Sequence, residues 1–282
     1  MAITLTEPRL YLGVDSAGIE SFCIADGTAC AFTIRAPGKE SDNEDSMGLV
    51  PCSGNSGVLV VADGLGGLPS GDQASATAVR QVSHKTTENC GEQLAQRDAI
   101  LDGIEQANKI VIEHGIGSGT TIAAVGIEKN HIRPYHVGDS AILISGQRGK
   151  IKYLTIPHSP VGYAIEAGLI EADEAIYHED RHLVSNIIGT AEMRVEIGPV
   201  IKLAPRDTLV IASDGLFDNL QIEEIVNIIR TGPLQLAAGS LATICRERMT
   251  EISDPRPPTP DDLGFSLFRP GRSSGTTTSP SH

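Results

Sequence analysis

Three apolar stretches of the chain end in an aspartate that is followed by glycine or serine. They are VVADGLGG (60–67), HVGDS (136–140) and VIASDGLFD (210–218). A carboxylate at a strand end is held rigidly, and a small residue after it lets backbone or ligand approach closely. Oxygen ligands of this kind suit hard divalent cations. One such aspartate is most simply a turn residue, but three of them, with the acidic segments SDNEDS (41–46) and PDDLGF (260–265), predict a metal site.

The apolar stretches have the length of strands, and amphipathic patterns between them have the length of helices. Strands are predicted over 57–62, 120–127, 131–137, 141–145, 207–213 and 263–268, and helices over 72–87, 92–114 and 221–230. This order favours an α+β fold in which sheets stack as a sandwich with helices outside. The strands on either side of Gly138-Asp139-Ser140 are too close for a helical crossover, which predicts an antiparallel hairpin there.

The composition is that of a globular protein, with 40% hydrophobic residues and 30 glycines in 282 residues. The net charge of −14 opposes binding to nucleic acid or to an anionic membrane surface. No apolar run approaches the roughly 20 residues of a spanning helix, and no basic and apolar leader begins the chain. We therefore expect a soluble, cytoplasmic protein, and a monomer.

A composition change marks the C-terminal end of the predicted domain. The last residues, RPGRSSGTTTSPSH, offer almost nothing to bury, which predicts one domain over 1–268 and a disordered tail over 269–282. The five cysteines are odd in number and scattered without a CxxC pair. We expect reduced thiols that mostly pack in the interior.

Six motifs follow one another in the order found in one enzyme family. They are Asn43-Glu44-Asp45, DGxGG (63–67), SGTT (118–121), GDS (138–140), SDGLxD (213–218) and an Asp-Asp pair before the last strand. From about Ser41 to Phe268 the chain resembles the metal-dependent serine/threonine protein phosphatases of the 2C type, in their bacterial branch. The resemblance implies a four-layer α/β/β/α sandwich of two antiparallel sheets flanked by helices, with two Mg²⁺ or Mn²⁺ ions at one end.

The resemblance also assigns ligands to the two ions. Asp63 matches the carboxylate that bridges both ions, and the Gly64 carbonyl matches a ligand of one of them. Asp214 and Asp261 match ligands of the other ion. Carboxylates, carbonyls and water select Mg²⁺ and Mn²⁺ over softer metals, so the residue types agree with this assignment. Asp63 and Asp214 are the expected catalytic residues.

Further acidic residues match the surroundings of these ions. Asp45 and Glu44 would lie around the second ion, partly through water, and Asp139 matches a ligand of a third, weaker site shared with Asp214. In the implied mechanism a hydroxide that bridges the two ions attacks phosphorus in line, without a phosphoenzyme. The implied substrates are phosphoserine and phosphothreonine in proteins that an opposing kinase modifies.

Two positions depart from the family pattern. Many members have an arginine three residues before the Asn of the NED motif to hold the substrate phosphate, whereas this chain has Glu40. An acid there repels a phosphate dianion, so the role passes to Lys39 or Arg35 or is lost, in which case the protein is a pseudophosphatase that acts as a sensor or scaffold. Leu65 stands where eukaryotic members often carry a histidine as general acid, so leaving-group protonation needs another donor.

The region from His158 to Ile188, here called the flap segment, resembles the part of the family fold that borders the cleft. It contains HEDRH at 178–182, which satisfies the HExxH pattern of zinc metalloproteases. That alternative is disfavoured because Asp180 and Arg181 are both charged and no third ligand is suitably spaced downstream.

Overall fold

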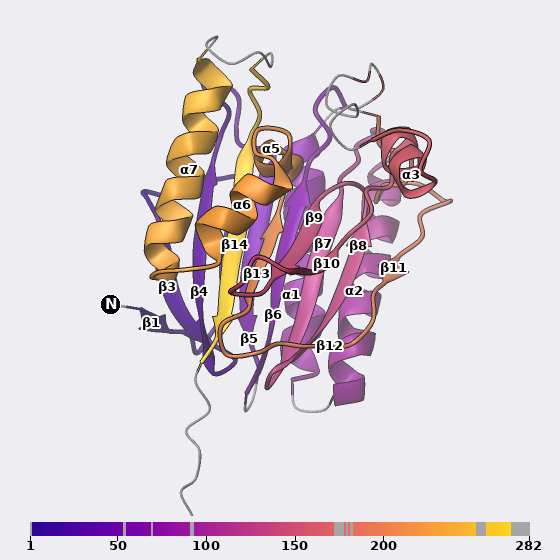
Figure 1. Ribbon diagram of the computed structural model, residues 1–282. Helices are drawn as coiled ribbons and strands as arrows, with labels where there is room; N and C mark the ends of the chain where they lie inside the picture. The colour runs from indigo at the N-terminus through magenta and orange to yellow at the C-terminus, as the bar shows by residue number, and fades with distance from the viewer. Residues whose placement is uncertain are drawn as a thin grey trace, which may run out of the picture.

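Two seven-stranded β-sheets face each other between helices in the computed structural model of the protein (Figure 1). The structure describes residues 2–52, 55–68, 70–90, 93–171, 178, 180, 183–251 and 258–271. The first sheet has the order β1-β3-β4-β14-β13-β9-β10 and the second β11-β8-β7-β6-β5-β2, with β12 also paired to β8. Neighbouring strands are antiparallel except β1 and β3, which are parallel.

The strands of the first sheet come from both ends and the middle of the chain. They are β1 (Ile3–Thr4), β3 (Glu20–Ile24), β4 (Gly27–Ile34), β9 (Ala141–Ser145), β10 (Ile151–Leu154), β13 (Thr208–Ala212) and β14 (Leu263–Pro270). Those of the second are β2 (Arg9–Leu12), β5 (Asp45–Pro51), β6 (Ser56–Asp63), β7 (Ile122–Glu128), β8 (His131–Val137), β11 (Glu196–Ile197) and β12 (Ile201–Lys202).

Helices cover the outer face of each sheet. The described helices are α1 (Gly71–Glu88), α2 (Gln93–His114), α3 (Pro160–Glu166), α5 (Asp214–Phe217), α6 (Ile222–Ile229) and α7 (Leu234–Thr250). Helices α1 and α2 pack on the second sheet, and α6 and α7 pack on the first. The predicted four-layer α/β/β/α sandwich is therefore confirmed.

The central strands are apolar on both faces because each sheet is covered on both sides. In β6, Leu59 and Val61 belong to the core between the sheets, whereas Val58, Val60 and Ala62 pack against α1 and α2. Alternate residues thus enter different cores, and none faces water. This explains the continuous apolar runs that mark these strands in the sequence.

The expected hairpin at Gly138-Asp139-Ser140 is wrong. Strand β8 belongs to the second sheet and β9 to the first, so the chain crosses between the sheets at this turn. Gly138 has a φ of +98°, and a Cβ there would lie 2.6 Å from the Thr121 Cβ atom. The prediction that no helix connects the two strands is correct, but a tight turn can join stacked sheets as well as neighbouring strands.

The last strand extends beyond the predicted domain boundary. Strand β14 continues to Pro270, and Arg269 donates hydrogen bonds to Thr208 Oγ1 and to the carbonyls of Ile229 and Gly232. These contacts hold two residues that the sequence assigned to the tail. Residues 272–282 of the predicted tail lie outside the described residues.

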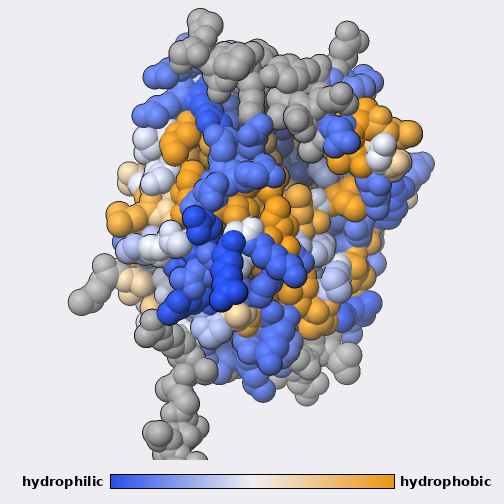
Figure 2. Space-filling view, in the orientation of Figure 1, coloured by the Kyte–Doolittle hydropathy of each residue, from blue (hydrophilic) through white to orange (hydrophobic). Residues whose placement is uncertain are grey.

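The flap segment contributes an apolar part of the surface. Figure 2 shows hydrophobic residues gathered over the region of α3, where Ile165 and Leu169 are exposed.

Within the described ranges, no helix is long and apolar enough to cross a membrane. All five cysteines are free, and Cys30 and Cys245 are buried, as expected for packing residues.

Candidate metal centre

Carboxylates from both sheets lie at one end of the sandwich. Asp45 begins β5 and Asp63 ends β6, and the two residues are register partners in the second sheet. Asp214 begins α5, two residues after the end of β13, and Asp261 lies in the loop two residues before β14, so both are next to strands of the first sheet. The Ser213 hydroxyl joins the two pairs by donating to Asp45 Oδ2 at 2.6 Å. With Asp139 these residues are called the carboxylate cluster.

Burial, together with the charges of neighbouring carboxylates, raises the pKa values of the cluster. Burial, and to a lesser extent Asp261 and Asp262, raises the pKa of Asp45 to about 8, although the Ser213 hydrogen bond opposes the rise. Burial and neighbouring carboxylates hold the pKa values of Asp63 and Asp214 well above their ordinary range. Burial and the charge of Asp261 raise the pKa of Asp139 to about 6. The cluster therefore needs protons or cations to be stable at neutral pH.

The donor atoms fit a hard divalent cation. Asp45 Oδ1 and Asp214 Oδ1 are buried and have no hydrogen-bond partner among the described residues. Buried oxygens of this kind are normally satisfied, so these two atoms require a missing partner. The side chains of Asp63, Asp139, Asp214 and Asp261 are half-buried rather than enclosed. An all-oxygen set at a partly open site is suited to Mg²⁺ or Mn²⁺.

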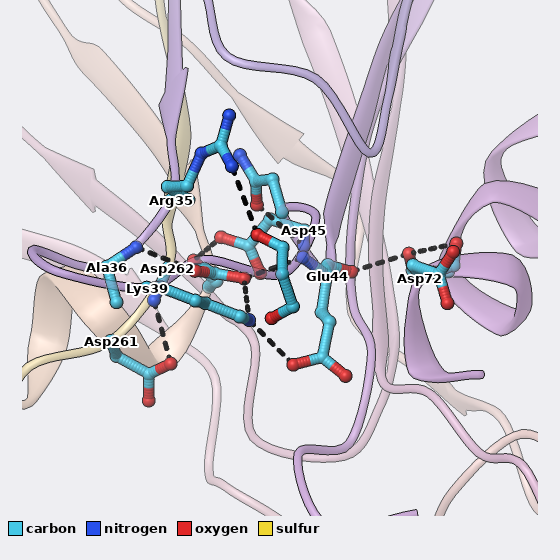
Figure 3. Close-up of polar contacts among 12 residues, drawn as sticks. Arg35, Ala36, Lys39, Glu44, Asp45, Asp72, Asp261 and Asp262 are labelled. Atoms are coloured by element: carbon cyan, nitrogen blue, oxygen red, sulfur yellow. Dashed lines mark hydrogen bonds and ion pairs between the residues drawn. The ribbon is translucent and has the colours of Figure 1, made fainter. Parts of the chain in front are cut away.

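Asp262 binds the loop before β5, and its oxygens are used for this contact and not for a cation. Its Oδ1 accepts a hydrogen bond from the Ala36 backbone N–H at 2.7 Å, and its Oδ2 accepts one from the Glu44 N–H at 2.6 Å. The Lys39 Nζ atom donates to the same Oδ2 at 2.7 Å (Figure 3). These donors satisfy both oxygens of Asp262, so Asp261 is the candidate ligand of the pair. The sequence showed the Asp-Asp pair but gave no separate role for its second member.

The two cations considered for phosphate binding are both paired with carboxylates. Lys39 Nζ lies 2.6 Å from Glu44 Oε2 as well as 2.7 Å from Asp262 (Figure 3). Arg35 Nε lies 2.9 Å from Asp15 Oδ2, and its Nη1 donates to the Ser41 carbonyl at 3.2 Å. Glu40 is exposed on this loop. Lys39 is thus held by two carboxylates, whereas Arg35 is paired with Asp15 through Nε and its side chain is 40% exposed.

Gly64 lies where the chain leaves β6 beside α1. Its N–H donates to the Glu44 carbonyl at 3.0 Å, and it forms an isolated bridge with Thr120. A Cβ at this position would lie 2.2 Å from the Gly71 carbonyl oxygen, so only glycine fits. Gly64 thus follows Asp63 directly and is hydrogen-bonded to the backbone of Glu44, and its role as a ligand stays a prediction.

Two threonines of the SGTT motif connect Asp63 to the Asp139 turn. The Thr120 hydroxyl donates to the Asp63 carbonyl at 2.7 Å, and Thr121 Oγ1 accepts the Asp63 N–H at 3.2 Å. The Thr121 and Ser140 hydroxyls are hydrogen-bonded at 2.7 Å. These contacts place Asp139 at the same end of the molecule as Asp63.

The residues of the zinc-protease pattern are only partly described. His178 and Asp180 are exposed, and Glu179, Arg181 and His182 lie outside the described residues. Away from the cluster, His136, His158 and Glu196 bring one potential ligand atom each to within 4.8 Å of one another. The sequence did not single out this group, because its members come from three separate segments.

Comparisons with known proteins agree with this geometry. The family model described as Protein phosphatase 2C matches residues 38–231. A putative protein phosphatase 2C-type of Streptococcus pyogenes is 32% identical over 198 residues, which is 68% of this chain and 80% of that protein. The solved serine/threonine phosphatase of S. agalactiae has a TM-score of 0.74 at 29% identity, covering 86% of this chain and 98% of that one.

A second solved structure supports the fold. The catalytic domain of the serine/threonine protein phosphatase PstP, solved in complex with two manganese ions, has a TM-score of 0.67 at 23% identity, covering 86% of this chain and 96% of that one. The family model matches more than half of the chain, and the sandwich fold and the carboxylate cluster agree with that match. The chain belongs to the protein phosphatase 2C family.

Proposed function

We propose that the carboxylate cluster is a Mg²⁺ or Mn²⁺ centre at which this protein phosphatase hydrolyses phosphoserine and phosphothreonine in protein substrates. The observation that carries the proposal is the pair of buried, unpartnered oxygens of Asp45 and Asp214 within a set of mutually repelling carboxylates. A structural acidic cluster would be expected to have its oxygens satisfied by hydrogen-bond donors. Family membership and this cluster leave the pseudophosphatase and metalloprotease alternatives without support.

Each residue has a distinct proposed task at the metal centre. Asp63 and the Gly64 carbonyl, with Asp214 and Asp261, hold two ions, and Asp45 and Glu44 complete the surroundings of the second. Asp139 and Asp214 would share a third, weaker site. Divalent ions, when bound here, supply an activated water as nucleophile and neutralise charge on the transferred phosphoryl group.

The chain's other residues keep these ligands in place. Ser213 fixes one oxygen of Asp45 and directs the other toward the centre. Asp262 and Lys39 bind the loop that carries Glu44. Lys39 would therefore contact a substrate phosphate only after leaving Glu44 or Asp262.

The biological setting follows from the chemistry. Phosphoprotein substrates require a kinase that forms the phosphomonoester, so we infer an opposing serine/threonine kinase. Five free cysteines are typical of a reducing compartment and support a cytoplasmic location. We also propose a monomer, which a measurement of mass in solution tests.

The test uses para-nitrophenyl phosphate and a phosphothreonine peptide, with Mn²⁺, Mg²⁺, Zn²⁺ or EDTA in parallel. We expect Mn²⁺-dependent release of phosphate from both substrates, abolished by EDTA. Asp63→Asn and Asp214→Asn should each lower turnover by at least about 100-fold, because each removes a charged ligand. Asp98→Asn is the control, since that side chain is 60% exposed and lies on α2. Wild-type turnover in either cluster variant would overturn the assignment.

A further inference from the structure

The imidazole of His158 is buried where the flap segment begins. Its Nδ1 atom accepts hydrogen bonds from the Gly138 backbone N–H at 3.0 Å and from Asn186 Nδ2 at 2.8 Å. Its Nε2 atom lies 3.1 Å from Glu196 Oε2, and its ring stacks on His136 with centroids 4.4 Å apart. The side chain is 2% exposed, so water cannot replace these partners.

The partners of His158 determine which ring nitrogen carries the proton. Asn186 is oriented by Arg194, whose N–H donates to Asn186 Oδ1 at 3.1 Å and whose carbonyl accepts from Nδ2 at 2.8 Å. Both groups facing Nδ1 are therefore N–H donors, so Nδ1 is unprotonated. In the neutral ring the proton is then on Nε2 and is donated to Glu196.

This tautomer argues against a metal ion between His136, His158 and Glu196. A metal on Nε2 would require Nδ1 to carry the ring proton and to face two further N–H donors. His158 and Glu196 are better explained as a hydrogen-bonded pair, whereas the Nδ1 atom of the neighbouring His136 is buried and has no hydrogen-bond partner among the described residues. His158 connects two parts of the molecule, the turn that carries Asp139 and the end of the flap segment.

On one side, His158 holds the turn that carries Asp139. Besides the Nδ1 contact, the His158 N–H donates to the Gly138 carbonyl at 3.0 Å. The opposite side of the turn is held by the hydrogen bond between Ser140 and Thr121, and Thr121 in turn binds the Asp63 backbone. A continuous series of hydrogen bonds thus runs from His158 through the turn to Asp63.

On the other side, His158 holds the end of the flap segment. Its carbonyl accepts hydrogen bonds from the Ser185 N–H at 2.8 Å and from the Ser185 hydroxyl at 2.9 Å. Asn186 follows directly and binds the ring. The first and last parts of the flap segment are therefore connected at the same residue that holds the Asp139 turn.

We propose that His158 is a positioning residue that couples the flap segment to the metal centre, through an unprotonated Nδ1 that fixes the turn bearing Asp139. The inference rests on the proposed function, because Asp139 must be a metal ligand for the coupling to matter. Replacing a residue that positions a metal ligand commonly changes metal affinity or activity by 10–100-fold.

Two substitutions separate the role of Nδ1 from simple loss of the ring. In His158→Asn the amide oxygen takes the place of Nδ1 and can accept the same N–H groups. In His158→Gln the amide lies farther out, toward Glu196, and leaves Gly138 and Asn186 without an acceptor. His84→Gln is the matched control, because that histidine on α1 is 62% exposed. Mn²⁺ binding is followed by calorimetry, and kcat and KM are measured with the phosphothreonine peptide.

We expect His158→Gln to weaken binding of the weakest Mn²⁺ ion by about tenfold and to lower kcat more than it raises KM. His158→Asn should remain within about threefold of the wild type, and His84→Gln should match it. Equal Mn²⁺ affinity in His158→Gln and His158→Asn would overturn the proposal. Failure of the proposed function would look different, because the wild type itself would then lack Mn²⁺-dependent hydrolysis.

A measurement on the wild type does not depend on the folding of any variant. Nitrogen NMR of the histidine-labelled protein should show the His158 ring protonated at Nε2 and unprotonated at Nδ1. A proton on Nδ1 at neutral pH would contradict the proposed hydrogen bond from Gly138.

Discussion

The neighbouring aspartates Asp261 and Asp262, directly before β14, differ in what surrounds them. Asp262 is buried and accepts hydrogen bonds from two backbone N–H groups and from Lys39. For Asp261, burial outweighs the hydrogen bond from the Asp262 N–H and raises its pKa. A carboxylate that is already satisfied supports structure, whereas one that is not is available to a cation.

The two aspartates should therefore respond differently to substitution. Asp261→Asn is expected to weaken Mn²⁺ binding and turnover by at least about tenfold, with little loss of stability. Asp262→Ala should lower the free energy of unfolding by roughly 3 kcal/mol, because it leaves Lys39 and two N–H groups without their acceptor. Calorimetric Mn²⁺ titration and urea unfolding measure the two effects. Unchanged Mn²⁺ affinity in Asp261→Asn would contradict the distinction.

The raised pKa of Asp45 predicts how pH affects the metal-free protein. Its pKa is about 8 in the folded protein against an ordinary value of 3.8, so the folded state binds more protons than the unfolded state between these values. The contribution of Asp45 to the free energy of unfolding is therefore largest at low pH and is lost as the pH rises toward 8. Burial lowers the pKa of His136 to about 4, so a comparison above pH 6.5 avoids its opposite contribution.

In EDTA, the free energy of unfolding should fall by about 2 kcal/mol or more between pH 6.5 and 8.5. Urea unfolding at the two pH values measures the change. Asp45→Asn is the matched variant and should flatten the dependence. Metal-free wild type that was as stable at pH 8.5 as at pH 6.5 would be inconsistent with a strongly repelling cluster.

At the scale of elements, the sequence predicts long apolar strands better than their partners. The runs in β6 and β13 were recognised because both faces of each strand are buried. The β3–β4 hairpin was missed, since small residues weaken its pattern and its turn has Ala25 and Asp26 at positive φ. Helix α7 is also not predicted from the sequence, because its buried face mixes three alanines with Leu234, Leu241, Cys245 and Met249 and so gives a weak apolar pattern. Which sheet β8 and β9 join depends on tertiary packing, which no local pattern reports.

The turn between β8 and β9 gives a test at this scale. Gly138→Ala should lower the free energy of unfolding by more than about 1 kcal/mol, because of the positive φ and the 2.6 Å approach to Thr121. It should also weaken Mn²⁺ binding at the site that includes Asp139. Gly239→Ala in α7 is the matched control, since a Cβ there meets nothing within 4 Å and should stabilise the helix by about 0.5–1 kcal/mol. Equal effects of both changes on Mn²⁺ affinity would refute the role of the turn.

At the scale of the whole molecule, the proposed metal centre lies where the two sheets meet. Asp45 and Asp63 lie in strands of the second sheet, and Asp214 and Asp261 lie beside the ends of β13 and β14 in the first sheet. The sequence supplied the candidate residues through their ordered motifs. It could not supply the Ser213 bridge between the sheets, or the separate tasks of Asp261 and Asp262, because these depend on three-dimensional contacts.

A centre that spans both sheets should stabilise the entire fold when it is filled. At a free Mn²⁺ concentration 100 times Kd, we expect the free energy of unfolding to rise by about 2.7 kcal/mol. Thermal unfolding with Mn²⁺ and with EDTA measures the gain, which Asp45→Asn should reduce. If Mn²⁺ failed to raise the Tm of the wild type, a metal centre joining the sheets would not be tenable.

The most direct test of the central claim is the anomalous scattering of manganese in crystals grown with Mn²⁺. We predict two strong peaks within the carboxylate cluster, in contact with Asp63 and with oxygens of Asp45, Asp214 and Asp261. We predict no peak between His136, His158 and Glu196. Absence of manganese from the cluster, or its presence only at the histidine pair, would contradict the account.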